Sequence, residues 1–135
     1  MIMKMRYGEK DGLNELINEL PNDIIMAEIG CYAGESTELF LDSGKVKTLY
    51  GIDPWKNGYD DRDPASNSDM VEVENLFNMR INICMHNNKD IKVVKFKMTF
   101  KEAFDQLPEL DLVYIDGDHT YDGVLNDILL AKKKV

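Results

Sequence analysis

The sequence has no apolar run long enough to cross a membrane. Nowhere in its 135 residues do the apolar side chains approach a run of about 18, the length that a transmembrane helix needs. The opening residues, MIMKMRYGEKDG, lack the apolar core of a secretion signal. Cysteine is scarce, so Cys31 and Cys84 allow one disulfide at most, and nothing else indicates an oxidising compartment. We therefore expect a cytoplasmic protein with reduced thiols and no membrane partner.

Basic charge is also in short supply. The chain has 16 Lys and Arg against 25 Asp and Glu, a formal net charge of -9. Proteins that bind nucleic acid non-specifically neutralise phosphates with clustered basic side chains, so this balance argues against a nucleic-acid partner. The one basic run, Lys132–Lys134, is explained by a solvated helix end. A small-molecule partner remains the expectation.

What the chain does have is a regular alternation of strand-like and helix-like segments in a single domain of ordinary size, residues 1–135. The predicted strands are Ile24–Ile29, Val46–Ile52, Ile91–Phe96 and Leu112–Ile115. The predicted helices are Asp11–Leu20, Ser36–Asp42, Ser68 or Asp69 to Met85, Lys101–Leu107 and Tyr121–Lys133. Residues 55–67 read as a loop. This alternation predicts an α/β fold with a Rossmann-like, doubly wound parallel sheet between two helical layers, with its four strands in the order 3-2-1-4.

The long helix is predicted to face the core with one apolar side. The residues on or near that side are Val71, Leu76, Phe77, Met79 and Ile83.

Polar residues gather where the predicted strands end, and ligands of doubly wound sheets bind at that edge. After the first strand, Gly30 and Gly34 permit a tight turn and close approach of a ligand to the backbone. A dinucleotide-binding turn would carry a third glycine where Tyr32 stands. Glu28 and Glu35 flank the turn, which disfavours a diphosphate and suits a cationic ligand. A purely structural turn explains the glycines equally well.

Asp53 stands at the end of the second predicted strand. A carboxylate at this position can accept both hydroxyl groups of a ribose. The alternative is an aspartate that stabilises the turn before Pro54. Its combination with the glycine turn favours the ribose interpretation.

The fourth predicted strand ends in a cluster of Asp116, Asp118 and His119. The two carboxylates offer the hard oxygen ligands that Mg²⁺ or Ca²⁺ prefers. The imidazole of His119 has the ordinary pKa range of a general base. The alternative is that Asp118 or Thr120 caps the next helix and that His119 lies on the surface.

Three stretches carry a family resemblance: EIGCYAGEST at residues 28–37, YGIDPW at residues 50–55 and IDGDHTY at residues 115–121. Together, and in this order, they resemble the class I S-adenosylmethionine-dependent methyltransferases. The likeness is strongest to the small-molecule O-methyltransferase branch that includes macrocin-type and rhamnosyl sugar methyltransferases. The resemblance implies S-adenosylmethionine as cofactor and metal-assisted methylation of a small-molecule or sugar hydroxyl.

The resemblance also implies a role for each matching residue. The methionine end of the cofactor would be lined by Glu28, Gly30, Cys31, Tyr32 and Gly34, with Ser36 or Thr37 bonding its carboxylate. Asp53 would hold the ribose, and Pro54, Trp55, Met98 and Thr99 would border the adenine. Asp116 would contact the cofactor and, with Asp118, bind a metal such as Mg²⁺. His119, assisted by Asp116, would take the proton of the acceptor hydroxyl.

Members of that family have a sheet of about seven strands, whereas this chain supplies four predicted ones. We therefore expect the N-terminal part of the fold, with Leu112–Ile115 as an apolar edge strand that a homo-oligomer would cover. Two other functions stay open. One is a non-catalytic cofactor-binding or assembly module derived from such an enzyme, and the other is a nucleotide-dependent oxidoreductase.

Overall fold

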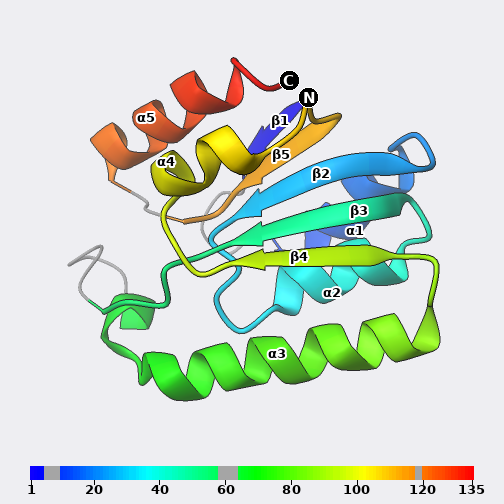
Figure 1. Ribbon diagram of the computed structural model, residues 1–135, viewed down its shortest axis with the longest axis horizontal. Coiled ribbons are helices and arrows are strands. Elements are labelled where there is room, and N and C mark those ends of the chain that lie inside the picture. Colours follow the sequence, from blue (N-terminus) through cyan, green and yellow to red (C-terminus); the bar gives the residue numbers. More distant parts are fainter. Residues whose placement is uncertain (5–9, 58–63, 118–119) are drawn as a thin grey trace.

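The computed structural model describes residues 1–4, 10–57, 64–117 and 120–135. Its sheet has five parallel strands in the order β1-β5-β2-β3-β4 (Figure 1). The strands are β1 (Ile2–Lys4), β2 (Ile24–Ile29), β3 (Val46–Ile52), β4 (Lys92–Phe96) and β5 (Leu112–Ile115). The helices are α1 (Lys10–Asn18), α2 (Glu35–Asp42), α3 (Met70–Asn87), α4 (Phe100–Ala103) and α5 (Tyr121–Ala131), with short 3-10 turns at Pro64–Asn67 and Phe104–Gln106. The predicted α/β class with a Rossmann-like parallel sheet is confirmed.

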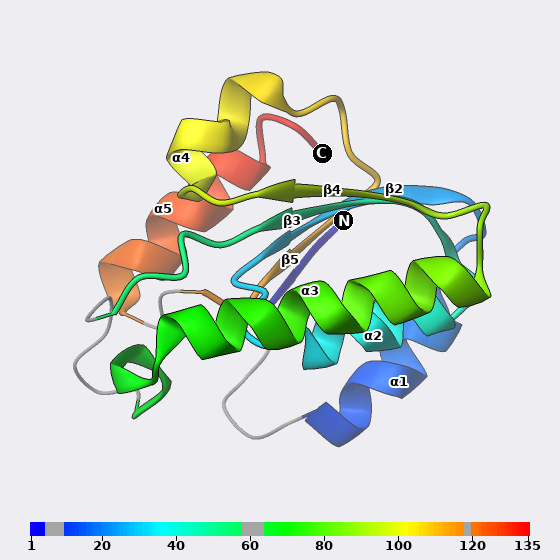
Figure 2. The ribbon, with the colours of Figure 1, turned by 60° about the horizontal axis from the view of Figure 1, so that its bottom comes forward.

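The sheet lies between two helical layers. Helices α1, α2 and α3 cover one face, and α4 and α5 cover the other (Figure 2). Successive residues of a strand point to opposite faces, so Met26 belongs to the core under α2 and α3, whereas Ala27 belongs to the core under α4 and α5. Burial on both faces explains why β5 is a continuous apolar run in the sequence and why β2 is apolar except at Glu28.

The edge of β5 is covered within the chain, contrary to the expectation of an exposed edge. Strand β1 pairs with it in parallel, with Met3 opposite Tyr114, and the backbone N–H of Val113 donates to the carbonyl of Met1 at 2.8 Å. The four predicted strands keep their order, and β1 is added beyond the fourth. A strand of three residues is too short to show periodicity, which is why the sequence pattern does not reveal it.

The face of α3 was predicted wrongly except at Phe77. The buried residues are Met70, Val73, Phe77, Ile81 and Cys84, whereas Val71, Leu76, Met79 and Ile83 are exposed. The helix carries two apolar stripes, and packing selects between them. The ring of Phe77 occupies space that side chains at Gly34 and Gly51 would fill, since a Cβ there would lie 3.1 and 3.3 Å from it.

The helices begin close to their predicted positions, and side-chain caps define the starts of α3 and α4. Asp69 caps α3 by accepting the backbone N–H groups of Val71 and Glu72. Thr99 and Glu102 form a reciprocal capping box that starts α4 at Phe100, one residue before the prediction. Among the described residues, no helix is long and apolar enough to span a membrane.

Candidate functional site

A cavity of 560 Å³ opens at the carboxyl ends of the strands, lined by residues that follow β2, β3, β4 and β5 and by residues of α4 and α5. Several predicted cofactor residues line it: Gly30, Tyr32, Asp53, Pro54, Met98, Thr99 and Asp116. Its walls also include Ile29, Ile52 and Phe100, which give it an apolar side. Apolar walls with a few convergent polar groups are typical of a ligand site.

The turn after β2 packs directly on the end of β5. The backbone N–H of Asp116 donates to the carbonyl of Ile29 at 2.7 Å. Gly30 has a φ of 86°, and a Cβ at this position would lie 2.3 Å from the carbonyl oxygen of Asp116. Glycine is therefore required here both by conformation and by space, and it brings the first turn and Asp116 to the same wall of the cavity.

The carboxylate of Asp53 joins the turns after β2 and β3. Its Oδ2 accepts the backbone N–H of Tyr32 at 2.9 Å, and its Oδ1 accepts the backbone N–H of Trp55 at 2.7 Å. An ionised carboxylate has about four acceptor sites, so Asp53 keeps acceptor capacity for a ligand beyond its backbone hydrogen bonds. Burial raises the pKa of Asp53, and backbone hydrogen bonds from Tyr32, Trp55 and Cys31 oppose that rise. Asp53 is thus a preoriented hydrogen-bond acceptor on the cavity wall.

Glu28 lies in a separate buried cluster and does not line the cavity. Its two carboxylate oxygens accept hydrogen bonds from the hydroxyl groups of Ser36 and Thr37, which start α2. All three side chains are buried. Burial raises the pKa of Glu28 to about 7, the two hydroxyl bonds lower it, and the charges of Asp116 and Asp53 raise it. In this structure, therefore, the predicted cofactor residues Glu28, Ser36 and Thr37 bond to one another.

Three further predicted cofactor residues also lie outside the cavity. The Sγ of Cys31 is 3.7 Å from the carbonyl of Glu28, and burial raises the pKa of this thiol well above its usual range. Gly34 contacts Phe77 of α3. Trp55 is only 5% exposed and packs in the core beneath α3. Both cysteines are free and buried, in keeping with reduced thiols.

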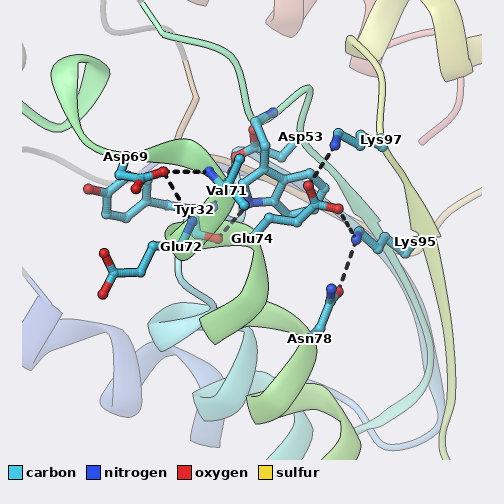
Figure 3. Close-up of polar contacts among 10 residues, drawn as sticks. Tyr32, Asp53, Asp69, Val71, Glu72, Glu74, Asn78, Lys95 and Lys97 are labelled. Carbon is cyan, nitrogen blue, oxygen red and sulfur yellow. Dashed lines mark hydrogen bonds and ion pairs between the residues drawn. The ribbon is translucent and has the colours of Figure 1, made fainter.

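A charged cluster beside Trp55 was not foreseen from the sequence. Glu74 of α3 forms ion pairs with Lys95 at 2.5 Å and Lys97 at 2.6 Å, and Lys95 also donates to Asn78 at 2.9 Å (Figure 3). The ammonium group of Lys95 stands 4.8 Å from the centre of the Trp55 ring. The cluster connects α3 to β4 behind the turn that carries Asp53. No local pattern reveals it, because its members are far apart in the sequence.

Helix α5 contributes a wall that the sequence analysis also missed. The cavity residues from this helix and its C-terminal turn are Gly123, Asn126, Asp127, Leu129, Leu130 and Lys133. Lys132 and Lys133 are exposed just after the end of α5, as expected for a solvated helix end. Lys133 lines the cavity, and the ammonium group of Lys134 donates to the carbonyl of Leu107 at 2.9 Å and stands 4.5 Å from the centre of the Phe104 ring.

Comparison with known proteins decides the family. The family described as a methyltransferase domain matches residues 27–135, which is most of the chain, from the second half of β2 onward. The chain belongs to this methyltransferase-domain family. The methyltransferase domain is also 31% identical over 115 residues to the uncharacterized protein R132 of Acanthamoeba polyphaga mimivirus. That match covers 84% of this chain and 48% of the viral protein.

Solved structures share the fold of the methyltransferase domain. One is precorrin 8W decarboxylase from Methanobacterium thermoautotrophicum, with a TM-score of 0.61 and 22% identity, covering 97% of this chain and 59% of that one. Another is MccB of E. coli, with a TM-score of 0.54 and 14% identity, covering 84% of this chain and 33% of that one. The chain thus spans 48% of the length of the viral relative and 59% of the length of the decarboxylase.

Of the predicted metal and base residues of the methyltransferase domain, the structure describes only one. Asp116 lines the cavity, whereas Asp118 and His119 lie outside the described residues. Within the described part of the chain, no three His, Cys, Asp or Glu side chains are grouped so that they could hold a metal ion. The metal assignment of Asp116 and Asp118 and the base assignment of His119 stay predictions.

Proposed function

We propose that this methyltransferase domain binds S-adenosylmethionine in the cavity and serves methyl transfer to a hydroxyl group of a small molecule or sugar. The observation that carries the proposal is the position of Asp53. Its carboxylate is fixed by two backbone N–H groups, lines the cavity, and lies beside the turn at Gly30, which lines the cavity as well.

The residues of the cavity suit this cofactor in charge and shape. Asp53 would accept hydrogen bonds from the ribose hydroxyls with its remaining lone pairs. Asp116, on the wall formed with Gly30, would face the positive charge of the ligand. The apolar walls at Ile52, Met98 and Phe100 would border the adenine. When bound, S-adenosylmethionine supplies a methyl group on a positively charged sulfur, and the domain's own contribution is to bind and orient it.

The arrangement of Glu28 refines the role that the family resemblance gives to the acidic residue of the first turn. Because its carboxylate already accepts two hydroxyl hydrogen bonds, Glu28 would act by fixing the start of α2 against β2. The ligand-facing carboxylates of the proposed site are then Asp53 and Asp116. Metal assistance would rest on Asp116, which lines the cavity, and on Asp118, which lies outside the described residues.

A calorimetric titration with S-adenosylmethionine tests the proposal, run with and without Mg²⁺. Saturable binding to one site supports it. Absence of heat and of any thermal shift at millimolar cofactor would contradict it. Tighter binding of a nicotinamide dinucleotide would favour the oxidoreductase alternative, because that class of ligand also uses a strand-end carboxylate for its ribose.

The identity of the methyl acceptor needs its own experiment. The chain matches only about half of its viral relative, so the proposed cofactor site does not define the acceptor site. Incubation with radiolabelled S-adenosylmethionine and a panel of sugars, catechols and other hydroxylated small molecules would identify an acceptor. Binding of the cofactor without turnover on any acceptor would favour the non-catalytic module.

A further inference from the structure

Two residues beside the cavity adopt a backbone conformation that side chains other than glycine rarely take. Tyr32 has a φ of 51° and Trp55 has a φ of 48°. For residues of this bulk, a left-handed conformation persists only where the surroundings impose it, and such positions concentrate at functional sites. Both residues donate their backbone N–H to the same group, the carboxylate of Asp53.

The peptide groups of Tyr32 are held from two sides. Its N–H is bound by Asp53, and its carbonyl oxygen accepts the indole N–H of Trp55 at 2.9 Å. The phenol oxygen of Tyr32 is also 2.7 Å from the hydroxyl of Ser68, ahead of α3. Tyr32 and Asp53 line the cavity, whereas Trp55 does not. Trp55 can therefore influence the cavity only through Tyr32 and Asp53, to which it is hydrogen-bonded.

The indole ring is itself locked in place. It packs on Phe77 with ring centres 5.0 Å apart, and Lys95 covers it at 4.8 Å. Lys95 is in turn fixed by its ion pair with Glu74 (Figure 3). A donor with so little rotational freedom can impose a disfavoured conformation on its acceptor, because it cannot follow the acceptor when that backbone relaxes.

We propose that Trp55 is a positioning residue of the cofactor site, whose indole N–H holds Tyr32 left-handed and thereby keeps the carboxylate of Asp53 directed at the ligand. This inference rests on the proposed binding of S-adenosylmethionine. Loss of the indole N–H frees the carbonyl of Tyr32, so that the turn relaxes and Asp53 loses its fixed orientation. The expected result is a weakening of cofactor binding by about tenfold, the equivalent of one well-formed hydrogen bond.

Trp55 is the only tryptophan in the chain, which allows a substitution of one chemical group. Expression in a tryptophan auxotroph supplied with benzothienylalanine replaces the indole N–H by sulfur and keeps the fused ring. Calorimetry with S-adenosylmethionine should show an about tenfold larger Kd than for the unsubstituted protein. The melting temperature should change little, because the contacts with Phe77 and Lys95 remain.

A second pair of variants guards against a general loss of structure. Trp55→Phe and Trp55→His both reduce the ring, but the Nε2–H of neutral imidazole can occupy the position of the indole N–H. At pH 8, Trp55→His should bind the cofactor several-fold more tightly than Trp55→Phe. Lys92→Met, at an exposed lysine of the same strand β4, should bind within about twofold of the parent protein.

The outcomes separate the two proposals. Equal affinities for the indole and benzothiophene proteins, or for the His and Phe variants, would overturn the positioning role while leaving the cofactor assignment intact. Failure of the parent protein to bind S-adenosylmethionine at all would overturn both.

Discussion

Gly30 and Asp116 approach so closely that a Cβ on the glycine would lie 2.3 Å from the carbonyl oxygen of the aspartate. The two residues directly follow the neighbouring strands β2 and β5, whose last residues, Ile29 and Ile115, are paired. This contact places the turn after β2 and the carboxylate of Asp116 on one wall of the cavity.

Gly30→Ala should therefore be among the most damaging single substitutions. The added methyl group overlaps backbone atoms, and the φ of 86° is unfavourable for alanine, so we expect a loss of about 3 kcal/mol or more of unfolding free energy. Gly44→Ala is the matched control, because Gly44 also has a positive φ of 75° but nothing within 4 Å of an added Cβ. Gly44→Ala should lower the unfolding free energy by about 1 kcal/mol. Equal losses in urea denaturation would contradict the steric argument.

Asp53→Ala should abolish binding of S-adenosylmethionine and also lower stability. The backbone N–H groups of Tyr32 and Trp55 lose their acceptor, which we expect to cost about 1–3 kcal/mol. Asp69→Ala is the control, because Asp69 likewise accepts two backbone N–H groups, as the cap of α3, but lies outside the cavity. It should lower stability by about 1 kcal/mol and leave the cofactor Kd within about twofold. Calorimetry measures the effect on binding, and urea denaturation measures the effect on stability. An equal loss of binding in both variants would contradict the assignment of Asp53 to the cofactor site.

Glu28 should make stability fall as pH rises. Its pKa is about 7 in the folded protein and 4.5 when unperturbed, so the folded state holds the proton more tightly. The resulting stabilisation is complete below pH 4.5 and is lost as pH rises through about 7, by about 3 kcal/mol. Glu28→Gln removes this dependence and keeps hydrogen-bonding capacity for Ser36 and Thr37. In urea denaturation between pH 4.5 and 8.5, the unfolding free energy of the variant should rise relative to that of the parent protein as pH increases. A constant difference would show that Glu28 does not titrate in this range.

Strand β1 should protect the edge of β5. Met3→Pro removes a backbone N–H and introduces a ring that a paired strand rarely accommodates, so β1 should detach from Val113 and Tyr114. The uncovered edge should increase concentration-dependent self-association, which analytical ultracentrifugation measures. Lys47→Ala, on the inner strand β3 with its side chain exposed, should leave the association state unchanged. A Met3→Pro protein that remains in the same association state as its parent would show that the edge does not depend on β1.

The amino-acid pattern by itself determined the class of fold. The strands from Ile24 to Ile29, Val46 to Ile52 and Leu112 to Ile115 were predicted to the residue, because the buried strands of a parallel sheet are mostly apolar. Because the strands are parallel, their carboxyl ends lie at one edge of the sheet. This explains why the sequence alone could place Gly30, Asp53 and Asp116 close together.

Only the tertiary structure decided how those side chains are used. Whether Glu28 faces a ligand or a pair of hydroxyl groups depends on the distance between β2 and the first turn of α2, which no local pattern encodes. Packing against the sheet decided which apolar residues of α3 are buried, and the ring of Phe77 lies next to Gly34 and Gly51. The pairing of β1 and the hold of Trp55 on Tyr32 likewise join residues distant in sequence, because packing and hydrogen bonding act through space, whereas periodicity reports only on neighbours along the chain.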